Sequence, residues 1–185
     1  MIHTIVTITG ASGSGKSTLE KELLKHFNGG RVRTITTRQP RSGETDKDYD
    51  FQTEECLADR TDLLWKLPIH SAIYAVAVPE FAKAAAEADG LAFVSITPER
   101  HEFLAKHFVS QGVRCVAIHL EHPGEVELTR RLKGRGESDE AIAKRLIDSV
   151  EFEDSAARVA NLNIIPQGTP IEVFQHVLRL IEVAP

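Results

Sequence analysis

A glycine-rich turn near the N-terminus constrains the fold of this chain more than any other feature. Residues 2–9 (IHTIVTIT) are rich in β-branched side chains and predict a buried strand that stops at Gly10. From Lys16 onward the apolar residues take the spacing of one helix face. The connection matches the pattern G-x-x-x-x-G-K-[ST] at every fixed position. Strand, glycine turn and helix therefore form the opening unit of the predicted fold.

The residue types of this turn point to phosphate chemistry. Glycines let backbone N–H groups curl around phosphate oxygens, and the N-terminus of the next helix carries a partial positive charge. Lys16 adds a full charge at the β and γ phosphates, and Ser17 offers a hydroxyl to Mg²⁺. The alternative, a turn that only joins a strand to a helix, gives no reason for adjacent Lys and Ser. We predict an ATP-binding P-loop made of Gly10, Ala11, Ser12, Gly13, Ser14, Gly15, Lys16, Ser17 and the supporting Thr18.

The alternation of strand and helix continues along the chain. Strand patterns cover residues 91–96, 113–120 and 162–165. Helical patterns cover residues 79–88, 98–108 and 124–133, a long segment capped by Ser138, and a last segment that begins at the capping box Thr169–Glu172. The polar segment 31–51 predicts loops around one short strand. This order favours an α/β fold with a parallel sheet covered on both faces.

Composition narrows the classes of function. With 185 residues, of which 42% are apolar and 26% charged, the chain suits one soluble domain. The net charge of −5 argues against a nucleic-acid partner, so any anion site has to be built locally. The apolar runs are far shorter than the roughly 20 residues of a membrane span, and no secretion signal opens the chain. We expect a cytoplasmic protein in which Cys56 and Cys115 are free thiols.

A second polar segment, residues 34–51 (TITTRQPRSGETDKDYDF), closely resembles a stretch of the guanylate kinase family. In that family the two arginines of T-T-R-x-P-R-x-G-E and the tyrosine of the following D-Y hold the phosphate of a nucleoside monophosphate. The resemblance gives these roles to Arg38, Arg41 and Tyr49, and Thr34 stands where the family often has a phosphate-binding serine. Guanidinium groups grip phosphate oxygens in pairs, which suits this role. A solvated basic loop, balanced by neighbouring acids, is the alternative.

Residues 130–146 (RRLKGRGESDEAIAKRL) look like the lid of the same family, a hinged helical pair that closes over ATP. By this resemblance Arg131 and Arg145 reach the transferring phosphates and Arg135 lies against the adenine. Closure would exclude water that hydrolyses ATP without transfer. The remaining basic residues of the segment, Arg130, Lys133 and Lys144, suit a solvated helix face.

The chain departs from the family where the base is read. The family has a carboxylate just before an N-Y-Y-G-[ST] segment, whereas this chain has Leu64-Trp65-Lys66 and then SAIYAV (71–76), which keeps Tyr74. The family also ends the strand aligned with residues 91–96 on an aspartate, and here the nearest polar residue is Ser95, followed by Thr97 and Glu99. Guanine N–H donors lose their partner when an acceptor is replaced by an apolar or cationic side chain. The acceptor base therefore stays open.

The resemblance implies a P-loop NTPase three-layer sandwich in one domain. Its predicted parts are a core (about 1–32, 89–124 and 151–185), an acceptor-binding region (about 33–88) and a lid (about 125–150). We expect a monomer or homodimer that moves the γ-phosphate of Mg-ATP to GMP, dGMP or another or modified nucleoside monophosphate. The predicted catalytic residues are Lys16, Arg38, Arg131 and Arg145, and the acceptor-binding residues are Thr34, Arg38, Arg41, Tyr49, Tyr74 and Ser95.

Two other functions stay open. Ribose 1,5-bisphosphate phosphokinases share the P-loop core, read no base, and have a Y-G-V-x-V-like segment that resembles YAVAV at residues 74–78. Guanylate-kinase-like folds also serve as binding modules without catalysis, and the absent strand-end aspartate favours that alternative. Three residues have structural explanations as well. His119 and His122 straddle a predicted strand end, which does not suit a metal site, and Trp65 either stacks on a base or fills the core.

Overall fold

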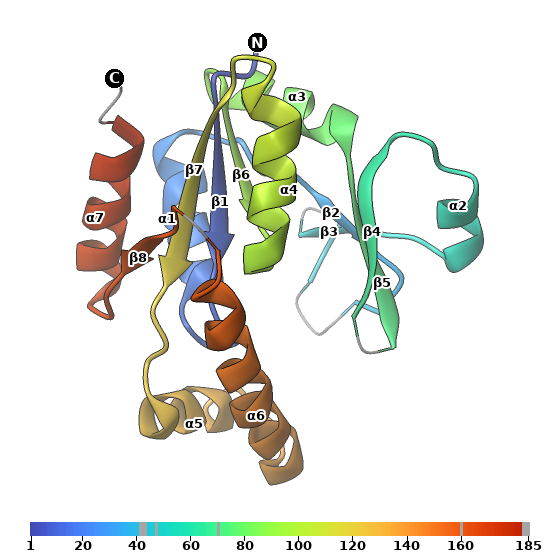
Figure 1. Ribbon diagram of the computed structural model, residues 1–185. Coiled ribbons are helices and arrows are strands. Elements are labelled where there is room, and N and C mark those ends of the chain that lie inside the picture. The colour runs from blue at the N-terminus through green and yellow to red at the C-terminus, as the bar shows by residue number, and fades with distance from the viewer. Residues whose placement is uncertain (41–43, 47, 70, 160, 183–185) are drawn as a thin grey trace.

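The computed structural model describes residues 1–40, 44–46, 48–69, 71–159 and 161–182, and a four-stranded parallel sheet lies at its centre (Figure 1). β1 (Thr4–Thr9) lies between β6 (Leu91–Ser95) and β7 (Arg114–Leu120), and β8 (Asn163–Ile165) pairs with the far side of β7. All three pairings are parallel. Every residue of β1 is buried, as expected of a central strand covered on both faces. The predicted α/β fold with a parallel core sheet is confirmed.

Helices cover both faces of this sheet, because alternate residues of β1 point to opposite sides. Ile5 packs on the side of α3 (Val78–Glu87) and α4 (Pro98–Val109), whose Phe81 and Leu104 are fully buried. Val6 packs on the side of α1 (Lys16–His26) and α7 (Pro170–Glu182). The three layers therefore follow from the period of two in β1. Of the helices that the structure describes, none is long and apolar enough to cross a membrane.

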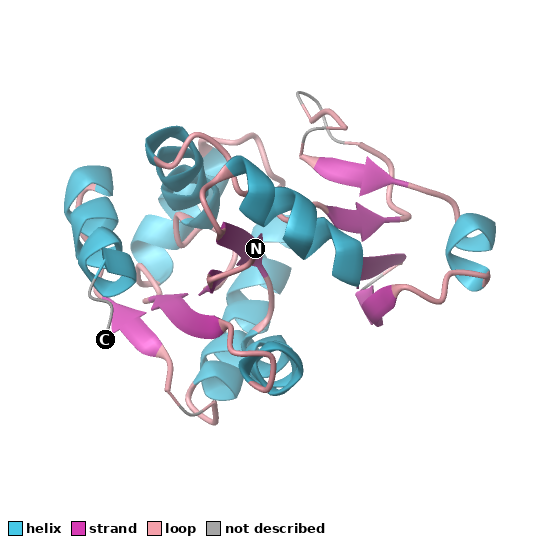
Figure 2. Cartoon of the chain, turned by 90° about the horizontal axis from the view of Figure 1, so that it is seen from above, coloured by secondary structure: helices cyan, strands magenta, loops and turns pink. Residues whose placement is uncertain are grey.

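A second sheet, ordered β3-β2-β5-β4, stands beside the core (Figure 2). Its members are β2 (Thr34–Thr36), β3 (Tyr49–Phe51), β4 (Leu63–Ile69) and β5 (Ala72–Ala77), and α2 (Glu54–Ala58) connects β3 to β4. β2 pairs with β3 in parallel, and the other two pairings are antiparallel. The prediction of a single short strand in residues 31–51 is wrong, since two strands form there. β4 and β5 are not predicted.

Two helices, α5 (Glu125–Lys133) and α6 (Asp139–Ala156), extend beyond the carboxyl ends of the core strands (Figure 1). They pack on each other through Leu128, Leu132 and Ile142. The Ser138 side chain accepts a hydrogen bond from the Ala141 N–H, so the predicted cap of α6 is confirmed. The capping box of α7 is confirmed too, because Thr169 and Glu172 exchange backbone-to-side-chain hydrogen bonds of 2.8 and 3.3 Å.

Candidate active site

The glycine-rich turn connects β1 to α1 at the carboxyl end of the core sheet. Gly13 and Gly15 have φ angles of +84° and +106°, in the left-handed region that favours glycine. A Cβ atom at Gly13 would also collide with the side chain of Leu128 on α5. Two features therefore favour glycine at position 13: its left-handed backbone conformation and the close approach of Leu128 on the neighbouring helix.

The Lys16 side chain folds back over this turn. Its Nζ donates hydrogen bonds to the carbonyl oxygens of Gly10 at 2.6 Å and Ala11 at 2.9 Å. Burial, together with the nearby charges of Arg135 and Arg145, lowers the pKa of Lys16 to about 8, against the opposing carboxylates of Glu20 and Glu153. Several cations thus converge where the turn begins. A bound anion would relieve their mutual repulsion.

The chemistry of the turn fits the phosphates of ATP with Mg²⁺. Ser14 Oγ is buried and has no hydrogen-bond partner among the residues that the structure describes. The first turn of α1 carries no acidic residue, so its helix dipole is left to favour an anion. Ser17 lines the adjoining cavity next to Lys16, where its hydroxyl would reach Mg²⁺. Thr18 is exposed, and its N–H donates to the Gly15 carbonyl, as a supporting residue would.

Two of the predicted lid arginines contact the glycine-rich turn. Arg145 of α6 donates from Nη1 to Ser12 Oγ at 2.9 Å and from Nε to the Glu137 carboxylate. Arg131 of α5 donates to the Gly13 carbonyl at 2.9 Å and to Glu127 at 2.7 Å. Arg135 is exposed and acts on Lys16 through its charge. Chain segments more than 100 residues apart in sequence are thereby joined at one phosphate-binding turn.

The predicted acceptor residues gather on the second sheet. Arg38 donates from Nη1 and Nη2 to the two oxygens of Glu44 at 2.6 and 2.8 Å, and from Nε to the Tyr74 hydroxyl at 3.1 Å. Its guanidinium lies over the Tyr49 ring, 4.8 Å from the centroid. Thr34 on β2 is paired with Tyr49 on β3. Arg41, also predicted for this site, lies outside the described residues.

One cavity of about 550 Å³ joins the glycine-rich turn to the second sheet. Its lining includes Lys16 and Ser17 from the turn and helix α1, Thr34, Tyr49 and Tyr74 from the second sheet, and Ser95 from the end of β6. Residues predicted from separate motifs therefore face the same space. Arg38, Arg131 and Arg145 are not among the lining residues: Arg38 and Arg145 contact the lining residues Tyr49 and Ser12, and Arg131 contacts Gly13 of the turn.

The cavity also contains charged residues that the sequence motifs did not reveal. Glu20 of α1 forms an ion pair with Arg31 at 3.2 Å, and Arg31 forms a second ion pair with Asp48 at 3.1 Å. Ser95 Oγ donates to Glu20 at 3.3 Å. Burial raises the pKa of Glu20, partly offset by the charge of Arg31. The available signal was helical spacing, since Glu20 follows Lys16 by four residues and so shares its face of α1.

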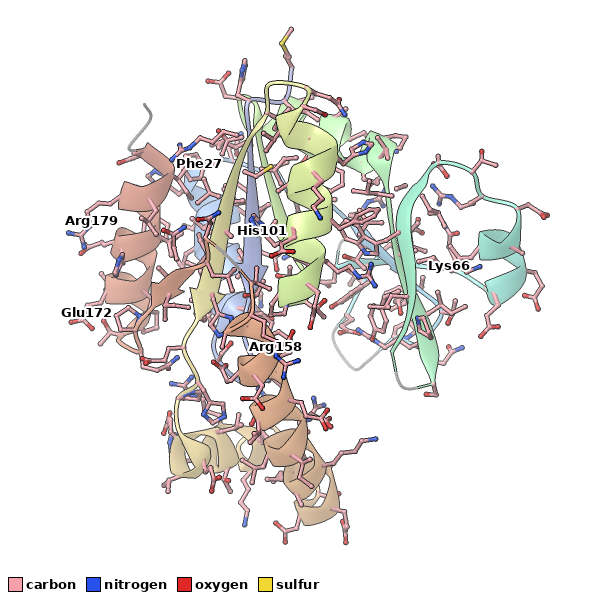
Figure 3. The ribbon with its side chains drawn as sticks, in the orientation of Figure 1. Phe27, Lys66, His101, Arg158, Glu172 and Arg179 are labelled. Carbon is pink, nitrogen blue, oxygen red and sulfur yellow. The ribbon has the colours of Figure 1, made fainter. Side chains whose placement is uncertain are left out.

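The side chains of β4 occupy the part of the cavity where the family has its base-binding carboxylate. Trp65 and Leu67 line the cavity, with Val76 of β5 beside them. Lys66, between them in sequence, points away from the core sheet on the exposed side of β4 (Figure 3). Trp65 is 8% exposed and belongs to the apolar core, so the core-filling prediction is confirmed. It also borders the cavity, and its stacking on a base stays a prediction. This wall is apolar rather than cationic.

His119 is a buried residue of the core. It is 1% exposed, and its ring nitrogens contact Thr9 Oγ1 at 2.8 Å and the Glu153 carboxylate at 2.9 Å. His122 accepts a hydrogen bond from the Gly124 N–H. Within the described part of the chain, no group of three or more His, Cys, Asp or Glu side chains could hold a metal ion.

The parallel core sheet, the P-loop with arginines above it, and a second sheet that shares its cavity define a P-loop nucleotide kinase. The sequence model of the guanylate kinase family matches residues 2–160. A guanylate kinase from Helicobacter pylori is 32% identical over 156 residues, covering 78% of this chain and 71% of the relative. One from Prochlorococcus marinus is 28% identical over 191 residues, covering 96% of each.

The crystal structure of guanylate kinase from Anaplasma phagocytophilum superimposes with a TM-score of 0.68 over 97% of this chain and 85% of that one. At 18% identity this similarity shows the shared fold. Together with the family match, it places the chain: it belongs to the guanylate kinase family, and it is a nucleoside monophosphate kinase.

Proposed function

We propose that this chain transfers the γ-phosphoryl group of Mg-ATP to GMP or dGMP, or to a closely related nucleoside monophosphate. The observation that carries the proposal is the shared cavity, which has Lys16 at one end and Thr34, Tyr49 and Tyr74 at the other. The relatives from Helicobacter pylori and Prochlorococcus marinus, both named guanylate kinases, support GMP as the first acceptor to test.

On the donor side, this chain binds and orients the phosphates. Backbone N–H groups of the glycine-rich turn and the Lys16 ammonium would hold the β and γ oxygens, exchanging the carbonyl contacts that Lys16 now makes. Arg131 and Arg145 would add positive charge where negative charge builds up during transfer. Mg²⁺, held by Ser17 when bound, would neutralise charge on the phosphates. We further propose that residues 125–150 act as the lid and exclude water.

On the acceptor side, Arg38 would hold the monophosphate. Its guanidinium already binds both oxygens of Glu44, an arrangement that also suits two oxygens of a phosphate. The hydroxyls of Tyr49 and Tyr74 would add directed donors beside it. Because the attacking phosphate is already ionised, no general base is required, and placement for in-line attack is the main task of these residues.

Ribose 1,5-bisphosphate is the second candidate acceptor, and one observation favours it. The cavity wall formed by Trp65, Leu67 and Val76 carries no side-chain acceptor for the N–H groups of guanine. A binding module without catalysis is favoured by Ser95, which ends β6 where the family has an aspartate. The arginine contacts to the P-loop support an enzyme instead. The predictions of a monomer or homodimer and of a cytoplasmic location stay predictions.

The test is an ADP-release assay with Mg-ATP and separate additions of GMP, dGMP, AMP and ribose 1,5-bisphosphate. We expect turnover with GMP or dGMP at rates of about 1–100 s⁻¹, typical of kinases. Turnover with ribose 1,5-bisphosphate alone would replace the proposal by the second candidate. ATP binding without turnover on any acceptor would favour the binding module.

A further inference from the structure

Three carboxylates line the cavity among the described residues, and they differ in how far their oxygens are already used. Both oxygens of Glu44 accept hydrogen bonds from Arg38. Asp48 accepts from Arg31 and from the backbone N–H and hydroxyl of Thr45. Within the described part of the chain, one oxygen of Glu20 forms an ion pair with Arg31 at 3.2 Å and the other accepts a hydrogen bond from Ser95. Since a carboxylate offers about four lone-pair sites, Glu20 keeps capacity to accept further hydrogen bonds.

Glu20 lies where it can reach an acceptor. It shares the cavity with Trp65 and Leu67, whose apolar surfaces suit the face of a base or a sugar. Its partner Arg31 continues to Asp48, the residue directly before Tyr49, so the ion-pair chain leads from α1 to the proposed phosphate-binding tyrosine. The side chain of Glu20 is 13% exposed. A hydrogen bond to a charged group in such a partly desolvated place is stronger than one in water.

We propose that Glu20 determines acceptor specificity in this kinase: its carboxylate accepts hydrogen bonds from guanine N–H groups or from the ribose 2′-hydroxyl, and Arg31 is the positioning residue that holds it. The inference rests on the proposed function for its substrate class. The carboxylate that reads the acceptor thus comes from the P-loop helix, since the walls formed by β4 and β5 carry none.

Calorimetric binding of GMP, dGMP, AMP and ATP to the full-length chain and to E20Q tests this inference. The glutamine keeps the shape of the side chain and removes its charge. We expect GMP affinity to fall at least about tenfold and ATP affinity to stay within about twofold. If base N–H groups are the donors, E20Q abolishes the preference for GMP over AMP; if the 2′-hydroxyl is, E20Q abolishes the preference for GMP over dGMP. E22Q, at an exposed position of α1, is the matched control.

Several results would overturn the inference. They are unchanged GMP affinity in E20Q, an equal loss on all three monophosphates, or a raised Mg²⁺ or ATP requirement with normal GMP binding. If E20Q does not fold, as judged by its thermal melting, Arg31→Lys takes its place. GMP affinity is then expected to fall about threefold or more, because a lysine ammonium lacks the spread of nitrogens with which Arg31 pairs with Glu20 and Asp48 together; an unchanged value would overturn the inference. Failure of the proposed function is distinguishable, because it appears as GMP binding without turnover in the unmodified chain.

Discussion

The two ends of the cavity are built in different ways. At the donor end, one continuous motif supplies the backbone turn, the ammonium of Lys16 and the hydroxyl of Ser17, and two arginines from α5 and α6 contact that turn. At the acceptor end, side chains from β2, β3, β5, β6 and α1 meet only in the folded chain. A phosphate-binding turn can therefore form from local backbone conformation, whereas the selection of an acceptor depends on packing between distant segments of the chain.

The largest effect is expected at the donor end. Lys16→Met should lower kcat for ADP release by at least about 10²–10³-fold, because the variant removes the charge that meets the transferring phosphate. Lys25→Met, on the exposed side of the same helix, is the control and should keep normal turnover. Comparable activity in the two variants would remove Lys16 from the site.

Arg145→Ala tests whether the α6 arginine that contacts the glycine-rich turn contributes to kcat as Lys16 does. We expect kcat to fall about 10²-fold while GMP affinity changes little, since the guanidinium contacts Ser12 of the turn and not the second sheet. Lys144→Ala, at the exposed neighbouring position, serves as the control. A loss confined to GMP affinity would contradict the division between the two ends.

Arg38→Ala is the corresponding change at the acceptor end. The KM for GMP should rise about tenfold or more, and the KM for ATP should stay near its original value. The reason is that Arg38 contacts Glu44 and Tyr74, on and beside the second sheet, and not the glycine-rich turn. Arg33→Ala removes a partly exposed arginine that pairs with Glu80 and is the control. Equal changes in both KM values would show that the two ends do not act separately.

The smallest expected effect is a pH dependence of the donor end alone. Burial lowers the pKa of Lys16 to about 8, and ATP takes the protonated form, so ATP affinity should fall about tenfold between pH 7 and pH 9. In the protein without ATP, the buried charge of Lys16 opposes folding at low pH. This unfavourable contribution is lost as the pH rises from about 8 to 10.5, the ordinary pKa of lysine, so the free energy of unfolding increases over this range. Calorimetry at both pH values, with Lys16→Met for comparison, measures the effect. Equal ATP affinity at pH 7 and pH 9 would show that ATP binding does not depend on the protonation of Lys16.

The second sheet shows why part of the fold escaped prediction. β4 contains Pro68, which argues against a strand, yet β4 lies at the edge of its sheet, where a missing N–H donor is tolerated. Its register shifts between Leu63 and Trp65, so Leu64 and Trp65 are both buried and the alternation of polar and apolar residues is broken. Only the pairing of β4 with β5, and of β5 with β2, makes these segments strands.

The candidate site divides in the same manner. Lys16, Arg131 and Arg145, predicted from two motifs, meet at the glycine-rich turn, and Arg38, Tyr49 and Tyr74 meet on the second sheet. Their roles in the reaction stay predictions that the variants above address. Glu20 and Arg31 belong to no motif. Helical spacing places Glu20 on the Lys16 face of α1, but the residue types by themselves do not distinguish this pair from solvated charges. Their ion pair in the cavity is what identifies them.

The sequence alone determined the phosphate-binding turn and the caps of α6 and α7, because these depend on residues within one or two helical turns of each other. It also predicted the parallel core, because strand and helix patterns alternate along the chain, although the pairing of β1 with β6 joins residues as far apart as Thr4 and Leu91. The tertiary structure decided which walls of the cavity are apolar and which carboxylate faces the acceptor. Those features depend on contacts between segments as far apart as Glu20 and Ser95. Such contacts form only after the chain has paid the entropy of bringing them together, and no local pattern records them.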